Sequence, residues 1–249
     1  MRPDPSIAVE TSCRTGGVAL GLGGQCVESV SFDATRGHAT VLVGQMQALL
    51  AGRGLAPQDL SEVYVSAGPG SFTGLRVGIT AVRTLAQAVA HVRCVAVPTV
   101  RAVAENASEL DWRHLGVVLS ARAGSIYAAV FERHDGRAVQ REPGRTWEAR
   151  RFLAAAPRPI TLIGEALAYE TMTGPGVTHA WPDALERHLP KPEAAWRIGH
   201  DMARAGEFTA YRRLLPVYAR RPEAVRLWEQ RAERQTLAGG DCEGNHENG

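Results

Sequence analysis

The distribution of apolar and polar residues along the first part of the chain predicts strands and helices in alternation. Short runs rich in β-branched residues, bounded by polar turns, are typical of strands, and apolar residues three or four positions apart are typical of helices. Three consecutive strands come first, and helices then alternate with strands. The expected strands are 6–10, 16–22, 26–32, 62–67 and 93–97, and the expected helices are 38–52, 75–90 and 99–107.

The second part of the chain repeats this style less clearly. A hairpin of buried strands is expected at 115–121 and 125–132, followed by a helix at 147–156, a strand at 160–165 and a helix at 194–205. Mixed strands and helices in both parts predict an α/β architecture of two lobes. We place these lobes at 1–108 and 109–222, and we expect the Arg- and Glu-rich segment 223–249 to be a charged, disordered tail.

Charge and cysteine usage narrow the classes of function. The 249 residues include 28 Lys and Arg against 26 Asp and Glu, and this net charge of +2 does not require a nucleic-acid partner. The cysteines form no CxxC pair, so we expect a reducing compartment and no zinc site. No apolar run is long enough to cross a membrane, and no apolar leader follows Met1, so a cytoplasmic location is expected.

A glycine-rich segment, VSAGPGSFTGLRVG at 65–78, joins an expected strand to an expected helix. A helix N-terminus in this position can hold a phosphate. The segment lacks the lysine of a Walker loop, however, and it fits the dinucleotide-binding pattern only loosely. A sharp turn is the other interpretation, in which Gly68 and Gly70 supply positive φ angles and Ser71 or Thr73 caps the helix.

The helix that follows this segment is apolar around most of its circumference. Gly74 and Gly78 form a strip of small residues, and Leu75, Ile79 and Val82 cover more than one face. Such a helix lies deep in a core or is shared with a partner. The pattern therefore makes a partner interface one of two interpretations.

Several segments of the chain resemble one known family. GPGSFTGLRVG is similar, almost letter for letter, to the signature of the bacterial TsaB (YeaZ) family. IAVETS resembles that family's first strand and turn, RGHATVLVGQMQALL its first helix, VVLSARAGSIYAAVFE its second-lobe hairpin and LLPVYARRPEAV its closing segment. These matches occur in the family's order and span about residues 6–225.

The resemblance implies a two-lobed, actin-like and sugar-kinase-like ATPase fold with duplicated βββαβαβα lobes. It also implies a role in making threonylcarbamoyladenosine in tRNA, as a non-catalytic relative of the transferase TsaD. Members of the family pair with TsaD through helices of the first lobe and support a complex with the ATPase TsaE, so tRNA would be reached only through these partners. The residues expected at that interface are His38, Val41, Leu42, Met46, Gly74, Leu75, Gly78, Ile79 and Val82.

The chain differs from its enzymatic relatives at positions where those relatives have metal-binding or acidic residues. Thr99 and Val103 stand where TsaD has a metal-binding HxxxH pair, and neither is a strong metal ligand. Glu10 replaces the aspartate that holds the water shell of a metal ion in this fold, and Ser120 replaces the aspartate of the family's DAR sequence. These departures favour a scaffold without catalytic residues or a metal site.

Two hypotheses therefore stand. The first is a scaffold subunit that binds TsaD-like and TsaE-like partners, that pairs with a second copy when alone, and that needs no cofactor. The alternative is a nucleotide-binding enzyme of the same fold, kinase-like or carbamoyl-transferring, and even a scaffold could keep weak binding of magnesium–ATP. The vestigial nucleotide site is expected at Glu10, Thr11, Ser12, Gly68 and Gly70.

Overall fold

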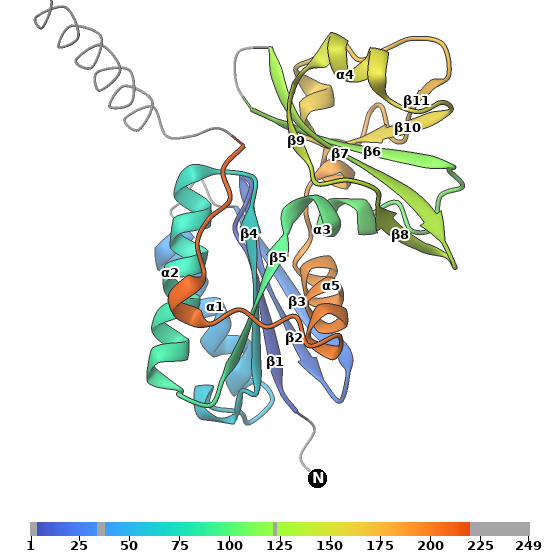
Figure 1. Cartoon of the computed structure of the whole chain (residues 1–249). Coiled ribbons are helices and arrows are strands. Elements are labelled where there is room, and N and C mark those ends of the chain that lie inside the picture. The colour runs from blue at the N-terminus through green and yellow to red at the C-terminus, as the bar shows by residue number, and fades with distance from the viewer. Residues whose placement is uncertain (1–3, 34–37, 122–123, 220–249) are drawn as a thin grey trace, which may run out of the picture. The chain divides into compact units, whose positions relative to one another are not determined.

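The computed structural model describes residues 4–33, 38–121 and 124–219, which form two mixed α/β lobes (Figure 1). The sheet of the first lobe has five strands in the order β3-β2-β1-β4-β5. β1 and β2, and β2 and β3, are antiparallel, whereas β1 and β4, and β4 and β5, are parallel. The strands are β1 (Ser6–Glu10), β2 (Thr15–Leu22), β3 (Gln25–Asp33), β4 (Glu62–Gly68) and β5 (Arg93–Pro98).

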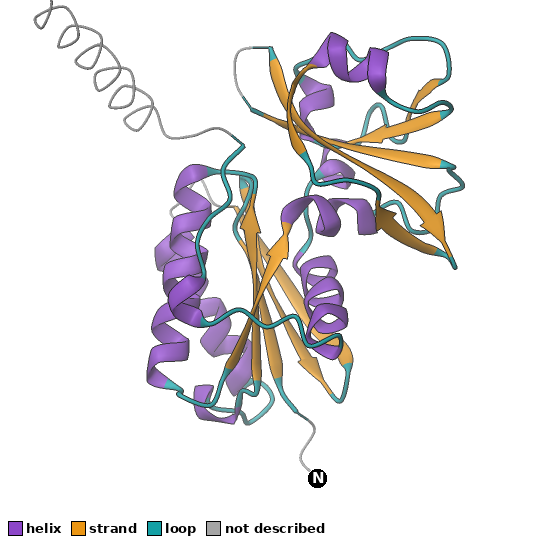
Figure 2. Cartoon of the chain, in the orientation of Figure 1, coloured by secondary structure: helices purple, strands orange, loops and turns teal. Residues whose placement is uncertain are grey.

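Helices cover both faces of this sheet (Figure 2). α1 (His38–Ala51) and α2 (Phe72–Ala88) lie on one face, and α5 (Pro192–Arg204) contacts all five strands. The alternation of side chains along a strand explains the two layers. In β1, Ile7 and Val9 pack with α1 and α2, whereas Ala8 packs with α5.

Small residues let α5 approach the sheet closely. A Cβ added at Gly21 of β2 would overlap the indole of Trp196, and that indole N–H donates a hydrogen bond of 2.9 Å to Ser6 Oγ. Trp196 is almost fully buried. The second face of the sheet is thus closed by a helix from near the end of the chain.

The second lobe repeats the plan of the first. Its sheet has the order β11-β10-β6-β7-β8, and β9 also pairs with β7. α3 (Thr99–Glu105) precedes it, and α4 (Ala149–Ala155) lies between β9 and β10. The strands are β6 (His114–Ser120), β7 (Ser125–His134), β8 (Arg137–Gln140), β9 (Arg145–Glu148), β10 (Ile160–Ile163) and β11 (Val177–His179). Short 3₁₀ turns occur at Pro57–Asp59, Glu165–Ala168, Leu185–His188 and Tyr211–Arg213.

The structure corrects the expected division of the chain in one respect. We assigned 109–222 to the second lobe, but α5 packs on the sheet of the first lobe, because its apolar side meets the small residues of that sheet. The expected tail at 223–249 lies outside the described residues. In the described part of the chain, no helix is long and apolar enough to span a membrane.

After α5, residues 208–219 run back along the first lobe to α2; we call this segment the strap (Figure 1). The Thr209 N–H donates to the carbonyl of Cys94 at 2.8 Å, and the Val217 N–H donates to the carbonyl of Ala67 at 2.7 Å. Between these bonds Leu214 is fully buried in the core beneath α1 and α2. The strap therefore ends over the glycine-rich segment.

Candidate functional site

The glycine-rich segment forms a sharp turn between β4 and α2. Gly68 has a φ of +109°, a conformation that favours glycine. Ser71 caps α2, because its Oγ accepts a hydrogen bond of 3.2 Å from the Gly74 N–H. The Ser71 N–H itself donates to the carbonyl of Ser12 at 2.6 Å. The expected helix cap is confirmed at Ser71, and the turn is fixed against the loop after β1.

Two further glycines let α2 lie close to that loop. A Cβ at Gly70 would overlap the carbonyl oxygen of Ser12, and a Cβ at Gly78 would overlap Thr11 Oγ1. Gly70 itself does not have a positive φ, so the sharp reversal depends on Gly68. The outer side of Gly68 is covered by the strap, since a Cβ there would overlap the carbonyl oxygen of Val217. The chain's own backbone therefore occupies the space beside the turn.

Glu10 lies at the end of β1 and is completely buried. One carboxylate oxygen accepts hydrogen bonds from Ser12, from its N–H at 2.6 Å and from its Oγ at 2.5 Å, and the other accepts from Ser66 Oγ. Burial raises the pKa of Glu10, and these hydrogen bonds oppose part of the rise. Both carboxylate oxygens of Glu10 therefore accept hydrogen bonds from residues of the same lobe.

The residues expected at a nucleotide site do not fit magnesium–ATP. The Glu10 carboxylate is enclosed by serine donors, Thr11 is buried against Gly78, and the strap covers Gly68. A magnesium ion needs oxygen ligands that face an open site and keep several of its waters. We therefore derive no catalytic step through these residues.

The neighbouring loop carries a cysteine that is poorly suited to nucleophilic chemistry. Cys13 is buried, and its thiol donates to the carbonyl of Thr15 at 3.0 Å. Burial raises the pKa of this thiol, and the nearby carboxylates of Glu10 and Glu165 raise it further. The reactive thiolate is accordingly disfavoured.

The positions that correspond to the metal-binding pair of TsaD are enclosed in the core. Thr99 and Val103 lie on α3 and are buried, and Val103 packs among the apolar residues of the second-lobe core. In residues 4–33, 38–121 and 124–219 there is no group of three or more His, Cys, Asp or Glu side chains that could hold a metal ion.

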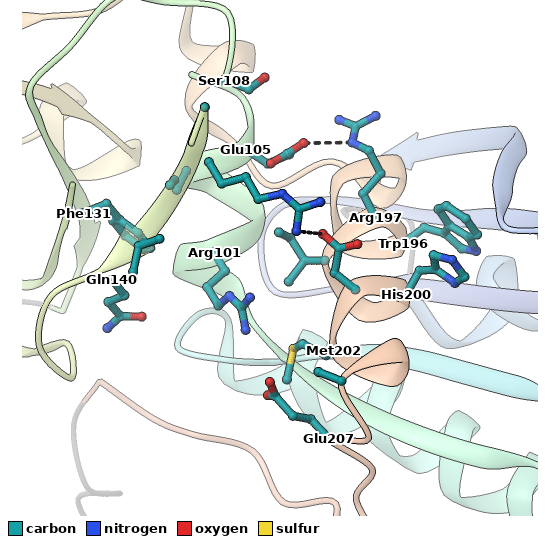
Figure 3. A pocket seen from close by; sticks show the side chains of 18 of the residues that line it. Arg101, Glu105, Ser108, Phe131, Gln140, Trp196, Arg197, His200, Met202 and Glu207 are labelled. Atoms are coloured by element: carbon teal, nitrogen blue, oxygen red, sulfur yellow. Dashed lines mark hydrogen bonds and ion pairs between the residues drawn. The ribbon is translucent and has the colours of Figure 1, made fainter. Parts of the chain in front are cut away.

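A large cavity of about 1040 Å³ lies beside α3, α5 and β8 (Figure 3). Four of its six charged side chains form two ion pairs: Arg197 lies 3.0 Å from Glu105, and Arg137 lies 3.6 Å from Asp201. These pairs balance much of the charge at its wall. The wall of the cavity therefore has as many positive as negative side chains.

The structure contradicts most of the expected interface. The apolar members of the set other than Val41 pack inside the first lobe, because they form its core with the sheet, and they are not exposed to a partner. Helix α1 begins at His38, but the side chain of His38 lies outside what the structure describes. Val41 is partly exposed. The buried members are Leu42, Met46, Gly74, Leu75, Gly78, Ile79 and Val82.

The outer sides of α1 and α2 present other residues. On α1, Val43 is 48% exposed, and Gly44 and Gln47 are also exposed. On α2, Thr80 and Thr84 face outward. Our sequence interpretation missed these residues because it looked for an apolar stripe, whereas an absence of charge was the usable signal. No Asp, Glu, Lys or Arg occurs between His38 and Ala51.

Comparisons with known proteins show which family this chain is similar to. A family model for TsaD, tRNA N6-adenosine threonylcarbamoyltransferase, matches residues 31–158, which is more than half of the chain. TsaB from Bacillus subtilis is 26% identical over 229 residues, covering 89% of this chain and 96% of that protein. The chain belongs to the TsaB (YeaZ) family, a relative of TsaD.

A second curated relative and one solved structure are also similar to this chain. TsaB from Escherichia coli is 26% identical over 231 residues, covering 86% of this chain and 94% of that protein. The structure of YeaZ from Pseudomonas aeruginosa superposes with a TM-score of 0.75 at 24% identity, covering 86% of this chain and 99% of that one. The expected two-lobed α/β fold is confirmed.

Proposed function

We propose that this chain is a non-catalytic, cytoplasmic scaffold subunit in the formation of threonylcarbamoyladenosine in tRNA. The names of two curated relatives support the process, because both are called tRNA threonylcarbamoyladenosine biosynthesis protein TsaB. Its partner is a TsaD-like transferase, joined by a TsaE-like ATPase, and tRNA is reached through those proteins. In the absence of these partners the same face pairs two copies of the chain.

The surface of α1 is the observation that carries this proposal. A surface helix normally places charged residues on its solvent side. α1 has 14 residues, none of which is Asp, Glu, Lys or Arg, and its outer side carries Val43, Gly44 and Gln47. Cores of protein interfaces are depleted in charge in the same way. This face is therefore suited to burial against another protein.

The outer side of α2 extends this uncharged face. α1 and α2 contact each other, and α2 contains only two charged residues, Arg76 and Arg83, in its 17 positions. The exposed Thr80 and Thr84 are short and uncharged. Two adjoining helices of this composition give a broad surface for a transferase subunit.

The contacts made by Glu10 and Gly68, two residues of the expected nucleotide site, support the absence of a catalytic role. Both oxygens of Glu10 accept hydrogen bonds within the lobe, and the strap lies against Gly68. A carboxylate that acts as base or metal ligand has to reach a substrate or ion. Glu10 instead joins the loop after β1 to β4.

Gly44 provides the test of the interface. A Cβ at this position meets nothing within 4 Å, so a larger side chain changes the outer surface without disturbing the core. Gly44→Arg is expected to weaken binding of the TsaD-like transferase at least about tenfold in calorimetry, a change of about 1.4 kcal/mol. Gly44→Ala is the matched control, and it should bind like the wild type. Equal binding by all three proteins would contradict the proposed face.

A nucleotide titration separates the scaffold from the enzyme hypothesis. Calorimetry with ATP and Mg²⁺ is expected to detect no tight binding to the chain alone. Tight one-to-one binding that Glu10→Gln abolishes would overturn the non-catalytic assignment.

A further inference from the structure

We propose that three arginines where α2 meets the strap pair with Asp or Glu side chains of the transferase partner and fix the orientation in which it docks. We call Arg76, Arg83 and Arg212 the arginine border. The identity of the partner rests on the proposed function. The border lies beside the uncharged faces of α1 and α2, and it adds the chemistry that the partner has to carry.

The charge of α1, α2 and the strap has a single sign. These elements, residues 38–51, 72–88 and 208–219, contain no Asp or Glu and four arginines, of which two belong to α2 and two to the strap. The fourth, Arg213, lines a pocket together with Glu142, so it is not counted in the border. The uncharged face is therefore flanked by cations and not by an even mixture of charges.

The three border residues lie on neighbouring parts of the surface. Arg76 and Arg83 are seven positions apart, which is about two turns, so they share one side of α2. Arg212 belongs to the 3₁₀ turn Tyr211–Arg213, and this turn contacts α2 (Figure 1). Arg76 and Arg212 are exposed, and Arg83 is half-buried. The border thus follows the side of α2 that adjoins the strap.

Aromatic side chains, and not acids, hold two of the guanidinium groups. The guanidinium carbon of Arg76 lies 4.1 Å from the centre of the Phe72 ring. Arg212 Nε donates a hydrogen bond of 3.0 Å to Tyr211 Oη. These contacts restrict the two side chains without neutralising them, so pairing with a partner orders little more of the chain.

The border arginines have no ion pair with any acid among the residues that the structure describes. Their charge is therefore available to a partner. The arginines that do form ion pairs in this part of the chain are Arg53, Arg93, Arg137, Arg141, Arg151 and Arg197.

A protein surface fits the border better than RNA does. A protein that holds a nucleic-acid backbone makes on the order of 6–10 phosphate contacts, whereas the border supplies three charges and the whole chain has a net charge of +2. Bases also need free aromatic faces on which to stack. The Phe72 ring already contacts Arg76, and its centre lies 5.0 Å from that of Tyr218. A few carboxylates on a protein match the border in number.

The place of the border explains what it contributes to docking. Interfaces bury an uncharged core and keep charged residues at the rim. Charges at a rim speed association and fix orientation more than they add affinity. The cations lie on the strap side of α2, whereas α1 has no charged residue. A partner with carboxylates on one side of its docking surface is therefore accepted in one orientation.

A zero-length cross-link tests the pairing directly on the full chain. Lys191 is the only lysine of the chain, so Arg212→Lys places a new amine at the border. A carbodiimide couples an amine to a carboxylate as an amide and takes up the water that is lost. We expect Arg212→Lys to be coupled to an Asp or Glu of the TsaD-like transferase. Arg150→Lys, on the exposed side of α4, is the matched control and should not be coupled.

Calorimetry of the same mixtures separates two kinds of failure. If the transferase binds but is not coupled at position 212, or is coupled equally to the control, the border is wrong and the proposed function stands. If the transferase does not bind the wild-type chain at all, the proposed function and the border are contradicted together.

Charge reversal gives a second, quantitative test through the rate of association. The double variant Arg76→Glu, Arg212→Glu should associate with the transferase at least about tenfold more slowly at about 50 mM salt, and within about twofold of the wild type at about 0.5 M salt. The control Arg113→Glu, Arg150→Glu changes the net charge equally at exposed positions of the second lobe and should stay within about threefold of the wild-type rate.

Two results of this experiment would contradict the border: a wild-type rate in the border variant, or equal slowing in the control. Binding of tRNA to the chain alone is measured in parallel with both variants. Loss of tRNA binding in the border variant, with unchanged association of the transferase, would assign the arginines to RNA and overturn the proposal.

Discussion

At the scale of residues, the glycines of segment 65–78 have separate structural tasks. Gly68 adopts a positive φ under the strap, and Gly70 and Gly78 leave room for Ser12 and Thr11. Each task brings two backbone segments closer than a side chain would permit. The motif that resembles a phosphate loop in sequence therefore acts here as a packing device between β1, β4 and α2.

Gly78→Ala is expected to destabilise the protein by about 1–3 kcal/mol, because the added methyl group overlaps Thr11 Oγ1 inside the lobe. Urea denaturation measures this free energy of unfolding. Gly44→Ala on α1 is the control, since its methyl group meets open space, and it should gain up to about 1 kcal/mol from helix propensity. A neutral Gly78→Ala would show that the close contact is not needed.

The buried carboxyl of Glu10 gives the protein a defined pH dependence. Its pKa is raised above the ordinary value of 4.5, so the folded state binds the proton more tightly than the unfolded state. The stability that Glu10 contributes is therefore expected to be fully present below this ordinary value and to be lost as pH rises through the folded pKa. Urea denaturation across this window measures the fall.

Glu10→Gln removes this titration. Burial also raises the pKa of Glu165 in the same direction, but Glu165 is present in both proteins. The difference in unfolding free energy between wild type and variant thus isolates Glu10. A difference that does not change with pH would contradict the assignment.

At the scale of elements, sequence periodicity located the longer helices and strands and missed what depends on distant contacts. β8 and β9 have four residues each and β11 has three, too few to display a pattern. The position of α5 depends on Gly21 and Ala8, which are far away in sequence. The expected interface failed for a related reason: apolar residues such as Leu42 and Ile79 were assigned to a partner, although the lobe's own sheet buries them.

The strap is an element that the sequence did not reveal, and its anchor can be tested. Leu214→Ala should cost about 2–5 kcal/mol in unfolding free energy, because a completely buried leucine is truncated. Hydrogen exchange should then show faster exchange of the Val217 N–H. Leu215→Ala is the control and should stay within about 0.5 kcal/mol of the wild type, since Leu215 is mostly exposed. Equal losses in both variants would contradict the anchoring role.

At the scale of the whole molecule, the structure combines a two-lobed fold with a glycine turn that packs against other parts of the same chain. The two-lobed architecture matches that of YeaZ from Pseudomonas aeruginosa. Within it, Glu10 and the glycine turn are occupied by internal contacts, while the outer sides of α1 and α2 are left without charge over most of their length. Internal contacts at the glycine turn and an uncharged helix surface are the features expected of a subunit that binds a partner and does not catalyse a reaction.

One measurement tests that claim most directly: the rate of threonylcarbamoyladenosine formation on tRNA by the TsaD-like transferase and the TsaE-like ATPase, with wild-type chain, Glu10→Gln or Gly44→Arg added. The account predicts that Glu10→Gln, once shown to be folded, supports the rate within about twofold of the wild type. It predicts that Gly44→Arg lowers the rate at least about tenfold, corresponding to about 1.4 kcal/mol. Full activity with Gly44→Arg together with loss of activity in Glu10→Gln would contradict it.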